Sequence, residues 1–169
     1  INAAKVETSG GSIQVNGVPN NEARIEVYVR PSNSKYSYTK EEIAKKLEEE
    51  YELTIDVTGN QVVAIAKNKK NFNINWNKAL SISFKVYIPV NSSTDLATSG
   101  GSISLANLNG KQDFRTSGGS LHIDKLSGTN KGRTSGGSIK IAQSKADDID
   151  LHTSGGSITV DNCSGKMEL

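Results

Sequence analysis

The hexapeptide Thr-Ser-Gly-Gly-Ser-(Ile/Leu) occurs five times in this chain of 169 residues. The copies begin at Thr8, Thr98, Thr116, Thr134 and Thr153, so the last four begin 18, 18 and 19 residues apart. A short fixed period is typical of proteins in which each repeat forms one coil stacked on the next. We therefore expect parallel coils in which equivalent residues lie directly over one another.

Aligned on their threonines, the copies share columns of apolar residues separated by columns of polar ones. Two apolar columns stand five and seven residues after the threonine: Ile13, Ile103, Leu121, Ile139 and Ile158, then Val15, Leu105, Ile123, Ile141 and Val160. The polar column between them is Gln14, Ser104, His122, Lys140 and Thr159. Two further columns stand ten after and two before the threonine: Val18, Leu108, Leu126, Ser144 and Cys163, then Val6, Leu96, Phe114, Gly132 and Leu151. This alternation predicts β-strands with apolar side chains inward and polar side chains outward.

Two kinds of corner are expected between these strands. The Gly-Gly pair predicts one, either because the backbone there needs a positive φ or because a neighbouring backbone approaches closely. Asn109-Gly110, Ser127-Gly128 and Ser164-Gly165 predict a second. One copy carries an extra residue within 146–150, which predicts a bulged corner.

Residues 20–90 lack the hexapeptide and its columns, and they predict an inserted α+β cap within a single domain, 1–169. The capping box Thr39–Glu42 predicts the start of a helix with Ile43, Leu47 and Tyr51 on one face. The expected strands are 22–30, 80–88 and the hairpin 52–57 with 61–66.

The totals exclude several classes of protein. Twenty basic and 18 acidic residues give a net charge of +2, which is not the excess of positive charge typical of nucleic-acid-binding proteins. No apolar run approaches the roughly 20 residues of a membrane span. A single cysteine, Cys163, excludes an internal disulfide and is expected to be a small buried apolar residue. The chain begins at Ile1 without an initiator methionine, so we expect that an upstream segment such as a signal peptide was removed.

The lead-in strand 81–89 followed by Leu96-Ala97-Thr98-Ser99-Gly100-Gly101 resembles the bacterial "putative adhesin" family of β-strand repeats. That family has no established function and is common in surface and envelope proteins. The resemblance implies a right-handed β-helix-like stack and an extracytoplasmic location, at the cell surface, at the outer membrane or in the periplasm. The family pattern has no catalytic residues to carry over.

We therefore expect an all-β, single-stranded parallel β-helix or solenoid of about 18-residue coils, with the α+β cap inserted. The expected function is that of a non-enzymatic exported surface or envelope protein, an adhesin or a scaffold. Two alternatives remain open: a carbohydrate-binding module, with a groove lined by Trp76 or tyrosine and asparagine partners, and a polysaccharide-acting β-helix enzyme.

No catalytic, metal or cofactor site is expected. The calcium-binding β-roll needs an aspartate shortly after Gly-Gly, and no copy has one there. No carboxylate pair recurs on an outward column, as hydrolysis would require. His122 and His152 fall in different columns, so the pattern does not predict a two-histidine metal site.

Four residues form the candidate ligand surface. Arg115, Arg133 and His152 share an outward column and could meet an acidic glycan or a carboxylate, although the same pattern also fits an ordinary solvated face. Trp76 could stack on a sugar or close the core of the cap. The expected partners are a glycan or another surface protein. Leu169 should point inward at the start of another coil.

Overall fold

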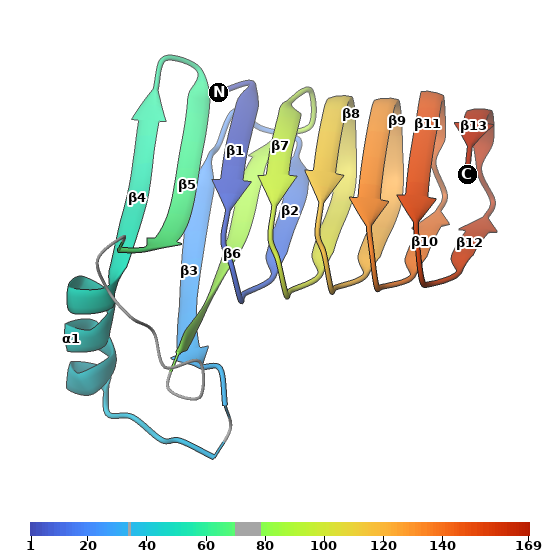
Figure 1. Cartoon of the computed structure of the whole chain (residues 1–169). Helices are drawn as coiled ribbons and strands as arrows, with labels where there is room; N and C mark the ends of the chain where they lie inside the picture. Colours follow the sequence, from blue (N-terminus) through green and yellow to red (C-terminus); the bar gives the residue numbers. More distant parts are fainter. Residues whose placement is uncertain (34, 70–78) are drawn as a thin grey trace.

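The hexapeptide copies pair with one another in parallel, one copy beside the next. The structure, a computed structural model, describes residues 1–33, 35–69 and 79–169 (Figure 1). The strand that follows each of the last four copies is β8 (Ile103–Arg115), β9 (Leu121–Thr134), β10 (Ile139–Ala142) and β12 (Ile158–Asp161). Their registers place Ile103 opposite Leu121, Leu121 opposite Ile139, and Ile139 opposite Ile158. The predicted stacking of equivalent residues is confirmed.

The other described elements complete the sheet. In chain order they are β1 (Ala3–Glu7), β2 (Ile13–Val18), β3 (Arg24–Pro31), α1 (Lys40–Glu50), β4 (Tyr51–Thr58), β5 (Gln61–Asn68), β6 (Leu80–Pro89), β7 (Ser93–Ala97), β11 (Lys145–Thr153) and β13 (Ser164–Glu168). The Gly-Gly pairs fall in the bends between strands, as expected. The predicted bulge is confirmed, because the register between β11 and β13 shifts between Lys145 and Asp148.

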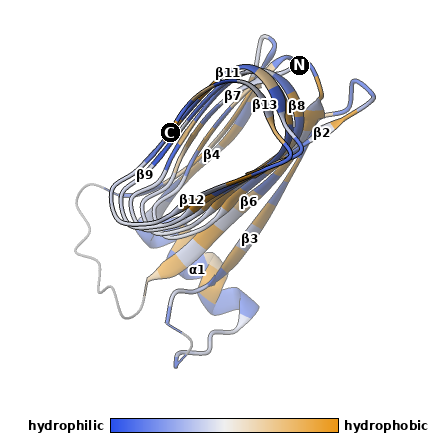
Figure 2. Ribbon diagram, turned by 90° about the vertical axis from the view of Figure 1, so that its right-hand side faces the viewer, coloured by the Kyte–Doolittle hydropathy of each residue, from blue (hydrophilic) through white to orange (hydrophobic). Residues whose placement is uncertain are grey.

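The predicted fold class is wrong. The strands form one 13-stranded sheet that mixes parallel and antiparallel pairs and curls into a half-barrel, not a parallel β-helix or solenoid (Figure 2). The pairs β3–β6 and β4–β5 are antiparallel. The long strands β8 and β9, of 13 and 14 residues, bend and continue from one side of the half-barrel to the other. The period predicted how the copies stack, but it carries no information about the antiparallel strands that extend the sheet.

We call the two sides of the half-barrel the front wall and the back wall, as Figure 1 shows them. The front wall consists of β4, β5, β1, β7, the C-terminal parts of β8 and β9, β11 and β13. The back wall consists of β3, β6, β2, the N-terminal parts of β8 and β9, β10 and β12. The apolar columns of both walls face each other across the interior.

The described strands of the inserted region, 20–90, continue the sheet from the strands around the first copy. Strand β5 pairs with β1 in parallel, with Val62 opposite Ala4. Strand β6 pairs with β2 in parallel, with Val86 opposite Val15. The physical reason is that β1 and β2 would otherwise leave unpaired backbone groups at a sheet edge. The inserted strands β5 and β6 form hydrogen bonds with those backbone groups and continue the inner apolar face of the sheet.

The core lies between the walls and consists mostly of aliphatic side chains. The largest fully buried ones are Phe84, Phe114, Ile13, Ile88, Leu96, Ile103, Leu105, Leu108, Leu121, Leu126, Ile139 and Ile141. Burying one such side chain contributes about 1.5–3 kcal/mol. Four of the five copies place an isoleucine or leucine of the hexapeptide itself in this core, which explains the last position of the motif.

Two predictions about side chains fail while the elements around them are confirmed. Helix α1 begins after Thr39, whose hydroxyl accepts the N–H of Glu42 at 3.2 Å, as the capping box predicted. Tyr51, however, starts β4 instead of extending the helix face, and its hydroxyl accepts the N–H of Leu80 at 2.8 Å. Burial raises the pKa of the Tyr51 phenol. Leu169, expected to point inward, follows the end of β13 and is 58% exposed.

Candidate functional site

The threonines of the hexapeptide, the most conspicuous pattern in the sequence, form hydrogen bonds between neighbouring copies. The hydroxyl of Thr116 donates to the carbonyl oxygen of Gly101, in the preceding copy, at 2.8 Å. Three other copies make the same contact at 2.7–2.8 Å: Thr98 to Gly11, Thr134 to Gly119 and Thr153 to Gly137. The first copy has no copy before it, and there Thr8 donates to the carbonyl oxygen of Ile82 on β6.

The second glycine of each pair lies against that same carbonyl group. A Cβ on Gly119 would stand 2.0 Å from the oxygen of Gly101, which no real side chain tolerates. The nearest atom to a Cβ on Gly118 would be 3.6 Å away. Of the two reasons predicted for the Gly-Gly pair, close approach is therefore correct, and positive φ is found instead at the second corner, at Gly110, Gly128 and Gly165. Packing therefore explains the threonine and the second glycine of each hexapeptide.

The predicted basic strip lies on the outer surface of the front wall. Arg115 stands opposite Arg133 on β9, and Arg133 opposite His152 on β11. All three are exposed. The Arg115 guanidinium lies 3.1 Å from Asp95 and 3.9 Å from Asp113, so its charge is partly balanced by carboxylates. The structure brings the three residues together, and their binding of an acidic ligand stays a prediction.

Arg115 also borders a hollow of about 350 Å³ on this wall. The hollow forms where the small side chain of Ala97 separates Glu7 from Arg115. Trp76, the fourth candidate, lies outside the described residues.

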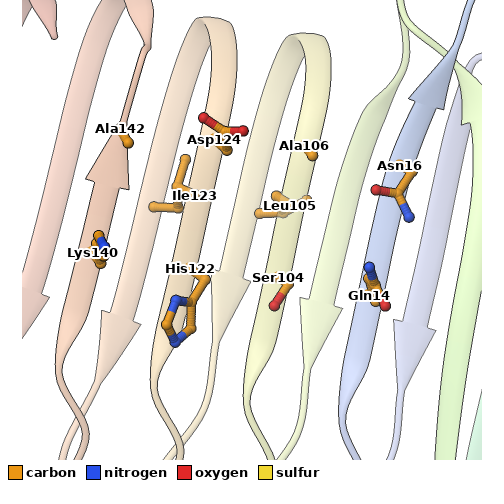
Figure 3. A pocket seen from close by; sticks show the side chains of 10 residues that line it. All are labelled: Gln14, Asn16, Ser104, Leu105, Ala106, His122, Ile123, Asp124, Lys140 and Ala142. Atoms are coloured by element: carbon orange, nitrogen blue, oxygen red, sulfur yellow. The ribbon is translucent and has the colours of Figure 1, made fainter. Parts of the chain in front are cut away.

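A second hollow, of about 320 Å³, lies on the outer surface of the back wall over β2, β8, β9 and β10 (Figure 3). Two rows of outward residues cross these strands. One row is the polar column of the sequence analysis: Gln14, Ser104, His122 and Lys140. The other row is Asn16, Ala106, Asp124 and Ala142. We call this feature the back-wall hollow.

Small side chains create the back-wall hollow. Asp124 stands between Ala106 on one neighbouring strand and Ala142 on the other. Leu105 and Ile123 lie between the two rows and are only 2% and 3% exposed, because they belong to the core. The sheet is therefore unbroken beneath the hollow, and Asp124 stands clear of its neighbours with its carboxylate accessible.

An aromatic and charged cluster flanks the back-wall hollow on β6 and β3. Tyr87 stands opposite Asn16, and Lys85 opposite Gln14. The Arg24 guanidinium lies 4.2 Å from the centre of the Tyr87 ring, a cation–π contact. The hydrogen bond with Lys85 lowers the pKa of Tyr87, and the same bond raises the pKa of Lys85.

Tyr28 extends this cluster along β3. Its hydroxyl donates to Glu26 at 2.6 Å, which raises the pKa of the phenol, and the side chain is 54% exposed. The outer face of the back wall therefore presents tyrosines, amides and charges side by side.

The sequence predicts one of the two rows of residues that line the back-wall hollow. The column with His122 and Lys140 was recognised as outward, but the neighbouring column was missed. The available signal was the position eight residues after each threonine: Asn16, Ala106, Asp124, Ala142 and Asp161. The residues after this column, Asn107, Lys125, Gln143 and Asn162, have φ between 49° and 58°, a left-handed column that the sequence did not reveal because lysine and glutamine rarely adopt it.

The chemistry available at these surfaces is that of hydrogen bonding and charge. Within the described part of the chain, no three histidine, cysteine, aspartate or glutamate side chains gather to hold a metal ion. Cys163 is half-buried, and its thiol lies 3.2 Å from the carbonyl oxygen of Asp161. None of the helical residues described here forms a segment long and apolar enough to span a bilayer.

Comparison with known proteins gives one distant likeness. No family model matches the chain, and no curated protein matches it. A crystal structure described as a "putative cell adhesion protein" from Clostridium sporogenes is similar over 98% of this chain and 89% of that chain, with 11% identity and a TM-score of 0.41. The β-strand-repeat family that the sequence resembles receives no support from a family model.

Proposed function

We propose that this protein is a non-enzymatic adhesin or scaffold that works at the cell surface or in the envelope, outside the cytoplasm. Its ligand binds to the outer face of the back wall. The observation that carries this proposal is the back-wall hollow, where four adjacent strands present polar side chains around an accessible carboxylate. The residues that line the hollow lie on strands, and sites built on strands hold their side chains more precisely than sites on loops.

A carbohydrate is the ligand that this chemistry favours. The amides of Gln14 and Asn16 can each donate and accept hydrogen bonds, and Asp124 can accept two from neighbouring hydroxyl groups. Tyr87 stands directly beside Asn16 and supplies an aromatic ring at the border. Tyrosine beside asparagine is the arrangement expected of a carbohydrate-binding module.

The residues that line the hollow favour binding over hydrolysis. Glycoside hydrolysis ordinarily requires two carboxyl groups on either side of the scissile bond. Asp124 is the sole carboxylate among the described residues that line the hollow, and the adjacent row contains Lys140 and His122 but no second carboxylate.

A glycan array tests the proposal. The wild-type domain should bind a subset of glycans, and Asp124→Ala should bind them roughly ten- to a hundredfold more weakly, as expected for the loss of hydrogen bonds to a charged group. Asp113→Ala, which removes a carboxylate from the front wall, is the matched control and should bind like wild type. Trp76→Ala, measured on the same array, tests the other predicted sugar contact.

Two results would contradict the proposal. One is an array on which wild type binds nothing. The other is an equal loss for Asp124→Ala and Asp113→Ala, which would place the ligand elsewhere or reflect a general effect of charge.

A further inference from the structure

Strand β4 is an open edge of the sheet. Among the described residues it pairs with β5 alone, so one side of its backbone has no strand beside it. Such an edge is a template for pairing with another strand. Proteins commonly protect edges with lysine, proline or bulges. The stretch 52–58, Glu-Leu-Thr-Ile-Asp-Val-Thr, contains no lysine or proline.

An apolar stripe runs along this edge strand. Leu53, Ile55 and Val57 are 36%, 47% and 58% exposed. Residues directly opposite one another in a sheet share a face. The residues opposite the stripe are Ala66, Ala64 and Val62, all buried in the core. The inner apolar face of the sheet therefore extends past its last covered strand.

The sequence of β4 is complementary to itself about Ile55. If a second β4 lies antiparallel with Ile55 opposite Ile55, then Leu53 faces Val57. In the same register Glu52 faces Thr58, and Thr54 faces Asp56. Each carboxylate then stands opposite a threonine and not opposite another carboxylate, and the Thr54 hydroxyl can donate a hydrogen bond to Asp56 of the second copy.

Neighbouring registers lack this complementarity. Shifts that keep apolar residues opposite apolar residues centre the pair on Thr54 or on Asp56. The first places Glu52 opposite Asp56, and the second places Asp56 opposite its own copy. Like charges directly opposite one another destabilise a strand pair. The charges therefore select the register centred on Ile55.

Two hydrogen bonds hold the Asp56 side chain in place on this edge. Its carboxylate accepts the N–H of Val57 at 2.8 Å and the hydroxyl of Thr58 at 3.0 Å. Glu52 stands opposite Lys67 on β5, and in the pair centred on Ile55 it stands opposite Thr58 of the second copy.

We propose that β4 is a self-association strand: two copies of this chain pair through it, antiparallel and centred on Ile55, and join their sheets. The partner is a second copy because the same patch is complementary to itself, as a twofold interface requires. This inference goes beyond the proposed function and does not depend on the ligand.

Sedimentation equilibrium over a range of protein concentrations tests the pairing. Wild type should show a reversible monomer–dimer equilibrium. Ile55→Lys places two ammonium groups opposite each other at the twofold axis and should leave monomer alone. Val160→Lys is the matched control, since Val160 is an exposed apolar residue, 38% exposed, on β12 at the opposite end of the sheet. It should dimerise like wild type.

Thr54→Lys tests the register. In the pairing centred on Ile55 the new lysine faces Asp56 of the second copy, and twofold symmetry creates this pair twice. The dimer should therefore be roughly two- to tenfold tighter than that of wild type. In the register centred on Thr54 the two lysines would face each other and weaken the dimer. Circular dichroism on each variant establishes that it is folded, which the exposure of both positions favours.

Three outcomes would overturn the proposal: a wild-type chain that remains monomeric at its highest soluble concentration, a dimer that survives Ile55→Lys, and a dimer lost in Val160→Lys. Weakening by Thr54→Lys would overturn the register.

Discussion

The strands that follow the hexapeptides and the strands inserted between the first and second copies belong to one sheet but are held in different ways. From β7 to β13 every strand pair is parallel. In these copies a threonine hydroxyl donates to one carbonyl group of the preceding copy, and the second glycine packs against the same carbonyl group. From β3 to β6 the chain adds antiparallel pairs, and α1 has no buried residue. The first region repeats one side-chain contact from copy to copy, whereas the inserted region combines alternation of apolar and polar residues with single contacts such as that of Tyr51 with Leu80. Substitutions of equal size should therefore have very different effects in the two regions.

The largest effect is expected from the second glycine of a hexapeptide. In Gly119→Ala the new methyl group would overlap the carbonyl oxygen of Gly101, and because both belong to the hydrogen-bonded sheet neither can move freely. We expect a loss of about 3 kcal/mol or more in the free energy of unfolding, measured by urea denaturation. Gly118→Ala, where there is room for the methyl group, should change stability little. Equal losses in the two variants would show that glycine is needed for another reason.

A smaller loss is expected when a hexapeptide threonine loses its hydroxyl. Thr116→Val keeps the shape of the buried side chain but leaves the carbonyl oxygen of Gly101 without this donor. The cost should be about 1–3 kcal/mol by the same measurement. Thr129→Val, at an exposed position of β9, is the control and should be nearly neutral. A neutral Thr116→Val would mean that the threonine column does not hold the copies together.

One buried position should gain stability from an apolar replacement. Asn130 is 1% exposed in the inner face of β9, and neither polar atom of its side chain has a hydrogen-bond partner. Asn130→Leu removes that unsatisfied group and keeps the branching and the number of side-chain heavy atoms, so we expect a gain of about 1 kcal/mol. A differential scanning calorimetry experiment should show a higher Tm. A lower Tm would indicate that the amide has a partner in solution, such as bound water.

The smallest effect is expected in the inserted region. Thr39→Ala removes the N-cap of α1 and should cost about 1 kcal/mol of local helix stability. Amides of α1 should then exchange with solvent faster, while the Tm of the whole chain should hardly move, because the helix buries no residue. A large fall in Tm would show that the inserted region is as tightly coupled to the sheet as the hexapeptide strands are.

The sequence predicted stacking well and topology poorly, for physical reasons. Identical residues at a fixed spacing, such as Ile103 and Leu121, can satisfy their backbones in the same way only by lying side by side. The pairing of β1 with β5 has no such signal, since Ala4 and Val62 are far apart in sequence and share only an apolar character. Tyr51 was misplaced because its position fits both the last turn of a helix and the first residue of a strand.

The candidate sites show the same contrast. Arg115, Arg133 and His152 were placed together because they share a column. The back-wall hollow was not predicted, because Ala106 and Ala142 produce a hollow only once the register places both beside Asp124.

The central claim is that each hexapeptide pairs in parallel with its equivalent in the next copy. NMR scalar couplings across backbone hydrogen bonds test it directly. The amide nitrogens of Ile103, Leu121 and Ile139 should couple to the carbonyl carbons of Ser120, Ser138 and Ser157, across bonds of 3.0, 3.0 and 2.9 Å. Couplings from these amides to carbonyls of an antiparallel neighbour, or to residues one position out of this register, would contradict the account.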